Sequence, residues 1–180
     1  MSKETILVLV RTMPEHSKKY GYRVCVAGIN QNQEWRRLYP FKFVYGKGLI
    51  DFDKKDIIEV DLTGPDNDKR KESRKVVQHK LLHNSLDDKA IITKLTPLLT
   101  SIEKMDGQKS TLGIIKPVVS EAVVIVNDTK LYDDQVYFSM TQGFLERREK
   151  VKLPIELHYK FKCFGEADCK GHNIILLIGN

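Results

Sequence analysis

The 180-residue chain carries 30 lysine and arginine residues against 24 aspartate and glutamate residues, giving a formal net charge of +6, and 41% of it is hydrophobic. This composition is ordinary for a globular protein with its own core, and no apolar run in the sequence approaches the roughly 20 residues that a membrane-spanning helix needs. The first apolar segment, residues 6–10, is too short for a secretory signal, so we expect a cytoplasmic protein with no membrane partner. Three cysteines cannot pair fully, which argues against a disulfide framework and favours free thiols or metal ligands.

The first half of the chain is rich in short segments with β-strand character. β-Branched residues and polar–apolar alternation predict strands over residues 4–11, 22–29, 35–41 and 57–62, with a short strand near Val76. Ala27 and Gly28 are small enough to let another backbone or a ligand come close to the second strand. A stretch dense in charge, residues 66–75, is expected to be a solvated loop that leads into the strand near Val76.

The second half contains one convincing helix signal. Ser85 is a candidate N-cap, followed by two acidic residues and an apolar face that ends near Leu95. Further strands are expected over residues 111–117, 118–126, 159–163 and 173–178, while residues 135–152 fit a strand or a helix equally well.

Together these elements predict a mostly-β fold with minor α content, built from one or two small barrels. The predicted division is an N-terminal barrel-like subdomain at residues 1–90 and a C-terminal β-rich subdomain at residues 91–180. One continuous domain is the alternative.

The C-terminal hairpin carries the clearest candidate site. Cys163, Cys169 and His172 follow the spacing C-x5-C-x2-H around a glycine-bearing loop, which is the composition of a zinc knuckle. A structural zinc ion needs four ligands, and Cys25 is the natural fourth if the hairpin packs beside the second strand. Under the alternative interpretation, Cys25 and Cys163 are small buried hydrophobes and His172 is an exposed turn residue.

A second candidate site combines aromatic and basic side chains on the third predicted strand. Such a surface can stack on bases and contact phosphates, as in β-barrels that bind single strands. The predicted nucleic-acid contacts are Trp35, Arg36, Arg37 and Tyr39, extended by Lys18, Lys19 and Arg23. Under the alternative interpretation, the aromatic residues fill the core and the arginines face water.

Three short stretches resemble the dual-OB (DuOB-like) domain proteins of prokaryotes. They are residues 24–29 (VCVAGI) followed by residues 35–38 (WRRL), residues 112–117 (LGIIKP), and the ending of residues 159–163 (YKFKC) with residues 169–172 (CKGH). The resemblance implies two OB-type barrels, binding of nucleic acid or nucleotide, and a part in defence against foreign nucleic acid. The sequence departs from that pattern after His172, where an apolar run replaces an acidic-aromatic ending, and no catalytic residue carries over.

The first hypothesis is therefore a nucleic-acid-binding module of OB type with a structural zinc site. A second is a metal-dependent enzyme acting on nucleic acid or nucleotide, with Cys163, Cys169 and His172 around a catalytic ion. A third is a subunit that binds a protein partner. No phosphate-binding loop or dinucleotide fingerprint is present in the sequence, and binding is favoured over catalysis.

Overall fold

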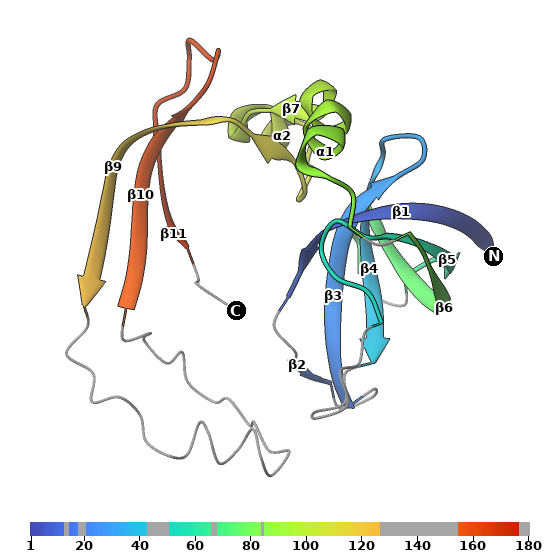
Figure 1. The fold of residues 1–180 in the computed structure, drawn as a ribbon. Coiled ribbons are helices and arrows are strands. Elements are labelled where there is room, and N and C mark those ends of the chain that lie inside the picture. Colours follow the sequence, from blue (N-terminus) through green and yellow to red (C-terminus); the bar gives the residue numbers. More distant parts are fainter. Residues whose placement is uncertain are drawn as a thin grey trace. The chain divides into compact units, whose positions relative to one another are not determined.

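The chain folds into two compact units, Met1–Lys116 and Pro117–Asn180, and each is described by itself (Figure 1). The computed structural model describes residues 1–12, 15–17, 21–42, 51–65, 68–83, 85–126 and 155–176. The predicted mostly-β fold with minor α content is confirmed. The first unit continues past residue 90, and its residues Gln108 and Thr111 are hydrogen-bonded to Lys71, Glu72 and Arg37.

Five strands of the first unit close into a barrel (Figure 1). In chain order they are β1 (Ser2–Arg11), β3 (Gly21–Asn30), β4 (Trp35–Lys42), β5 (Ile57–Thr63) and β6 (Ser73–His83). The order around the barrel is β1-β3-β4-β6-β5 and back to β1, with β4 and β6 parallel and all other neighbours antiparallel. This Greek-key order is consistent with a small OB-like barrel. A short strand, β2 (Glu15–Ser17), pairs with β3.

Alternation of apolar and polar residues along the strands builds the barrel core. On β5, the inward residues Ile58, Val60 and Leu62 are at most 1% exposed, while the residues between them are half-buried. The core joins apolar side chains from all five strands with Phe52: Ile6, Val8, Val24, Val26, Leu38, Phe41, Phe52, Ile58, Val60, Leu62 and Val76. Each aliphatic or aromatic side chain buried in this way contributes roughly 1.5–3 kcal/mol of transfer free energy.

Gly28 on β3 lies in close contact with the backbone of β1. A Cβ atom added there would lie 2.1 Å from the carbonyl oxygen of Leu7 on β1 and 2.8 Å from a side-chain carbon of Ile6. Only glycine fits beside this backbone, since the nearest atom belongs to the main chain and cannot move aside. The expected close approach of another backbone to this part of the second strand is confirmed.

Two short helices follow the barrel. The first, α1 (Asp88–Leu95), begins after Asp87, whose carboxylate accepts a hydrogen bond from the N–H of Ala90 at 2.8 Å. The prediction of Ser85 as N-cap is wrong, because the N–H of Ser85 donates to Asp56 and its φ is +37°. The second helix, α2 (Ile102–Gly107), was not predicted from the sequence. It is preceded by a 3-10 turn, η1 (Thr96–Leu98), and it lies between two short paired strands, β7 (Leu99–Thr100) and β8 (Ile114–Ile115).

The described residues of the second unit form a three-stranded antiparallel sheet in the order β11-β10-β9 (Figure 1). Its strands are β9 (Pro117–Val126), β10 (Ile155–Cys163) and β11 (His172–Leu176), and β10 and β11 are the predicted C-terminal hairpin. All ten residues of β9 are exposed. The ambiguous segment 135–152 lies outside the described residues. Among the helices that are described, none is long and apolar enough to cross a membrane.

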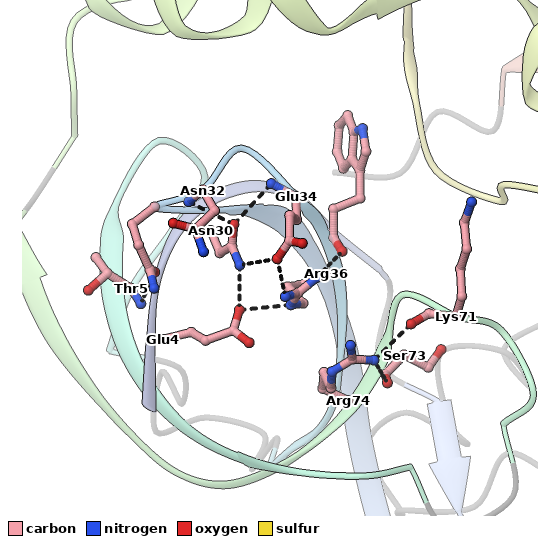
Figure 2. A network of polar contacts seen from close by, with 11 residues as sticks. Glu4, Thr5, Asn30, Asn32, Glu34, Arg36, Lys71, Ser73 and Arg74 are labelled. Carbon is pink, nitrogen blue, oxygen red and sulfur yellow. Dashed lines mark hydrogen bonds and ion pairs between the residues drawn. The ribbon is translucent and has the colours of Figure 1, made fainter. Parts of the chain in front are cut away.

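A charge network joins nearly buried side chains of the barrel to Glu34 in an exposed turn (Figure 2). Arg36 on β4 donates from Nε to Glu4 Oε2 at 2.7 Å and from Nη2 to Glu34 Oε2 at 2.5 Å. Asn30 donates from Nδ2 to the same two carboxylate oxygens at 2.8 and 2.9 Å, and its Oδ1 accepts the backbone N–H groups of Asn32 and Glu34. The network therefore ties β1 to the turn between β3 and β4. Hydrogen bonds from Asn30 and Arg36, and the positive charge of Arg36, hold the pKa of Glu34 below its ordinary value.

This network corrects the prediction that Arg36 contacts nucleic acid. Its side chain is only 10% exposed, and its third donor, Nη1, is bonded to the carbonyl oxygen of Trp35 at 3.1 Å. A guanidinium in which Nε, Nη1 and Nη2 are all engaged inside the protein holds the fold together. Period-two alternation explains the placement, since Arg36 has the same parity along β4 as the buried Leu38.

We predict that Arg36→Met lowers the free energy of unfolding by about 3 kcal/mol, because it leaves the nearly buried carboxylate of Glu4 without its cation. Urea unfolding of the purified protein measures this loss. Lys3→Met is the matched control, since it breaks only the ion pairs of an exposed lysine with Glu59 and Asp61 and should leave the unfolding midpoint nearly unchanged. Equal losses in the two variants would show that the buried network contributes no more than a surface pair.

Candidate functional site

The outward face of β3 and β4 is the first candidate surface, because OB-type barrels bind ligands across their second and third strands and the adjoining loops. Trp35, Arg37 and Tyr39 alternate with the inward residues Arg36 and Leu38, so all three lie on the outward face. Each is half-buried. Three of the predicted contact residues are therefore brought together on one face, while Arg36 is not.

The remaining predicted contacts are less fully described. Arg23 lies on β3 opposite Lys42 of β4, is half-buried, and donates to the carbonyl oxygen of Tyr22 at 2.8 Å. Lys18 and Lys19 lie outside the described residues. Arg23 therefore joins the basic side of β3 and β4.

The loop between β5 and β6 adds cations to this surface, in a stretch that the sequence predicts to be a solvated loop able to extend the basic surface. Because β6 runs parallel to β4, Tyr39 lies opposite Lys75 in the register. The cations of this loop and of the start of β6 are Lys69, Arg70, Lys71, Arg74 and Lys75. The density of charge over residues 66–75 was visible in the sequence. The position of this loop beside β4 was not, because it depends on the pairing of β4 with β6, which are distant in the chain.

Asp68 gives this loop its shape. Its carboxylate accepts hydrogen bonds from Arg70 Nε at 2.8 Å, from Arg70 Nη2 at 2.5 Å and from Ser73 Oγ at 2.7 Å. These hydrogen bonds, from Arg70 first, hold the pKa of the Asp68 carboxyl far below its ordinary range, although burial acts in the opposite direction. Arg70 is thus paired with Asp68, whereas Lys69 next to it forms no ion pair with any residue that the structure describes, and both cations are exposed.

A buried polar cluster lies beside Arg37. Glu72 is 4% exposed, and its Oε1 accepts hydrogen bonds from the N–H of Thr111, at 3.0 Å, and from the Thr111 hydroxyl. The Thr111 hydroxyl oxygen in turn accepts a hydrogen bond from Arg37 Nη2 at 3.1 Å. Arg37 Nε and Glu72 Oε2 are both buried, and neither has a hydrogen-bond partner within the described part of the chain. Burial acts to raise the pKa of Glu72, but the hydrogen bonds it accepts and the charge of Arg37 outweigh this and lower it.

The hairpin of β10 and β11 is the second candidate site. Cys163 ends β10, His172 begins β11 and Cys169 lies in the loop between them. Cys169 Sγ accepts a hydrogen bond from the N–H of Cys163 at 3.2 Å and lies 3.3 Å from His172 Nε2. The candidate ligand atoms of all three residues lie within 4.8 Å of one another, so these residues could hold a metal ion. Gly165 and Gly171 adopt φ values of +76° and +94°, which favour glycine and let the loop fold back.

Two thiols and an imidazole are ligands that zinc prefers, and the hairpin supplies three of the four that a structural zinc ion needs. In a tetrahedral site with bonds of 2.0–2.3 Å, neighbouring ligand atoms lie roughly 3.5 Å apart, close to the separation of Cys169 Sγ and His172 Nε2. Both cysteines are 4% exposed, and the ring of His172 packs on Phe161 with centroids 5.3 Å apart. His172 is therefore not the exposed turn residue of the alternative interpretation. Cys25, the predicted fourth ligand, is half-buried on β3 of the first unit, where its N–H donates to Thr12 Oγ1.

Comparison with known proteins gives one family. Residues 2–95 match the sequence model of a family described as a domain of unknown function, DUF8758. The match spans the barrel and α1 and stops before α2. No curated protein matches the sequence. The resemblance to the dual-OB proteins stays a prediction.

We predict that the first unit loses stability in acid. Asp68, Glu72 and Glu34 have lowered pKa values when folded, so their stabilising effect is complete above the ordinary carboxyl pKa of about 4 and is lost as the pH falls below it. Urea unfolding between pH 7 and pH 3 should show a flat midpoint that drops below about pH 4.5.

Asp68→Asn should flatten part of this pH dependence, because it removes the carboxyl whose pKa is lowered most. Asp106→Asn, at an exposed position in α2, should leave the pH dependence unchanged. The same slope in Asp68→Asn as in the unmodified protein would contradict the role given to this carboxylate.

Proposed function

The chain belongs to the DUF8758 family, and we propose that its barrel is a binding module for single-stranded nucleic acid. The observation that carries the proposal is the outward face of β3 and β4. There, two half-buried aromatic residues flank an arginine, next to a basic loop, on the two strands that OB-type barrels use for ligands.

The geometry of this face suits a single strand. Trp35 and Tyr39 are four residues apart on an extended strand, so their rings start roughly 13 Å from one another with Arg37 between them. Bases stacked on the two rings would bring the intervening phosphates near Arg37 and Lys75. Stacking on aromatic side chains tolerates any base, and contacts between cations and phosphates do not distinguish one base from another. We therefore expect a weak sequence preference.

We further propose that Cys163, Cys169 and His172 hold a structural zinc ion. This proposal is supported by two buried thiol groups beside an imidazole within one hairpin. Zinc bound there would supply strong bonds between the last residue of β10, the loop and the first residue of β11. The three residues would bind the ion, and the contact of His172 with Phe161 would hold the imidazole ring in place.

For nucleic-acid binding, we predict that a labelled single strand of about 12 nucleotides binds the protein in fluorescence anisotropy and that binding weakens steeply with salt. Trp35→Ala should weaken binding about tenfold, since stacking contributes roughly 1–3 kcal/mol per base. Arg23→Ala should reduce the slope of log affinity against log salt by about one. Lys80→Ala is the control, because Lys80 is exposed on the part of β6 that pairs with β5.

If Trp35→Ala and Arg23→Ala bind the strand with the same affinity as Lys80→Ala, the outward face of β3 and β4 is not the binding surface. Failure of the unmodified protein to bind the strand even at low salt would refute the nucleic-acid proposal as a whole.

For the metal, we predict about one zinc ion per chain by elemental analysis of the purified protein, lost in the double variant Cys163→Ser, Cys169→Ser. Cys25→Ser is the matched cysteine control and also tests the fourth ligand predicted from the sequence. Zinc that survives Cys25→Ser excludes Cys25 from the ligand set. A metal-free protein whose melting temperature is unchanged by chelator would refute the zinc site.

A further inference from the structure

The segment of residues 108–113, which links α2 to β8 and is called the strap here, is hydrogen-bonded to the proposed ligand surface. Lys71 Nζ donates to the carbonyl oxygen of Gln108 at 3.3 Å, and Arg37 Nη2 donates to Thr111 Oγ1 at 3.1 Å. Glu72 Oε1 accepts both the N–H and the hydroxyl of Thr111. All three partners of the strap lie on β4 or on the residues that lead into β6.

These contacts use the donors that a phosphate would need. The strap offers a carbonyl oxygen to Lys71 and a hydroxyl oxygen to Arg37, and in both cases a neutral acceptor takes the place that a phosphate oxygen could occupy. A phosphate is the stronger partner for either cation, since charge-assisted hydrogen bonds exceed neutral ones. We infer that the strap is a built-in competitor of the nucleic acid, and that ligand binding displaces Thr111 from Arg37. This inference rests on the proposed function.

The closed arrangement leaves polar groups unsatisfied. Arg37 Nε and Glu72 Oε2 are buried and have no hydrogen-bond partner among the residues that the structure describes. Burying such groups without a partner costs free energy, which weakens the closed state. A phosphate that reaches Arg37 can bond to Nε as well as Nη2, a geometry that the single hydroxyl of Thr111 does not provide.

The strap has features of a segment that can move as one piece. Helix α2 has only six residues and buries none of them. The turn after it is shaped locally: Ser110 N–H donates to the Met105 carbonyl oxygen at 2.9 Å, and a Cβ at Gly113 would lie 2.5 Å from Met105 Sδ. The same Cβ would lie 3.0 Å from Thr100 of β7. Because these contacts stay within the segment from β7 to the strap, opening the strap's contacts to Arg37, Lys71 and Glu72 does not require the strap to unfold. The family match also ends before the strap begins.

Thr111→Val tests the inference. It keeps the β-branched shape but removes the hydroxyl that accepts from Arg37 and donates to Glu72. We expect the 12-nucleotide strand to bind at least about fivefold more tightly than to the unmodified protein, since each of the two hydrogen bonds removed corresponds to a ratio of roughly that size. Thr93→Val is the matched control, since its hydroxyl bonds only to the Lys89 carbonyl oxygen within α1 and should change nothing. Adding Arg37→Ala to Thr111→Val should abolish the gain.

Hydrogen exchange gives a second readout that needs no variant. The Thr111 amide is protected by Glu72 in the free protein, and a saturating oligonucleotide should speed its exchange. If the unmodified protein binds the strand while Thr111→Val binds equally well and the Thr111 amide stays protected, the strap inference is overturned and the proposed function stands. If neither protein binds, the proposed function fails and the inference fails with it. If Thr111→Val binds the strand and the unmodified protein does not, the result supports both the proposed function and the strap inference, because the strap would then keep the unmodified protein closed.

Discussion

Closure of the barrel between β4 and β6 is the constraint on which the first unit depends. The two strands run parallel, so no hairpin can join them, and the chain must cross the barrel through β5 before β6 can pair with β4. That pairing fixes a register of Arg37 with Ser73 and of Tyr39 with Lys75. The basic loop before β6 is brought beside the aromatic residues of β4 in this way. The step that completes the core also assembles the candidate ligand surface.

Two adjacent arginines have opposite roles because side chains alternate across a strand. Arg36 points inward, where an isolated charge would be very costly, and is retained because Glu4, Glu34 and Asn30 complete its hydrogen bonds. Arg37 points outward and remains able to exchange one partner for another. A shift of β4 by one residue would place the wrong arginine inside, so the charge network specifies the register of β4 as well as stabilising it.

Much of the fold could be predicted from local patterns, and most of the site could not. β-Branched runs and period-two alternation located the barrel strands, although β6 was expected only as a short strand near Val76. Alternation also located the terminal hairpin, and cysteine spacing located the metal candidates. The parity of Arg36 with Leu38 was a usable signal for an inward arginine, but the partner Glu4 is 32 residues away in the chain. Thr111 is 74 residues from Arg37, and nothing in the local sequence of either residue marks the contact. The prediction of Ser85 as the helix cap failed for a similar reason. The N–H of Ser85 donates to Asp56, a residue distant in the sequence, and the local pattern gives no sign of this hydrogen bond.

The position of β1 between β3 and β5 has a consequence for synthesis of the protein. β3 emerges from the ribosome soon after β1, but β5 follows only after some further seconds at roughly 5–20 residues per second. During that interval one edge of β1 has no strand beside it. Glu4, Asn30, Glu34 and Arg36 all precede β5 in the chain, so the polar network can form on a nascent three-stranded sheet of β1, β3 and β4. The charges would then be paired while still in contact with water, before β5 and β6 enclose them.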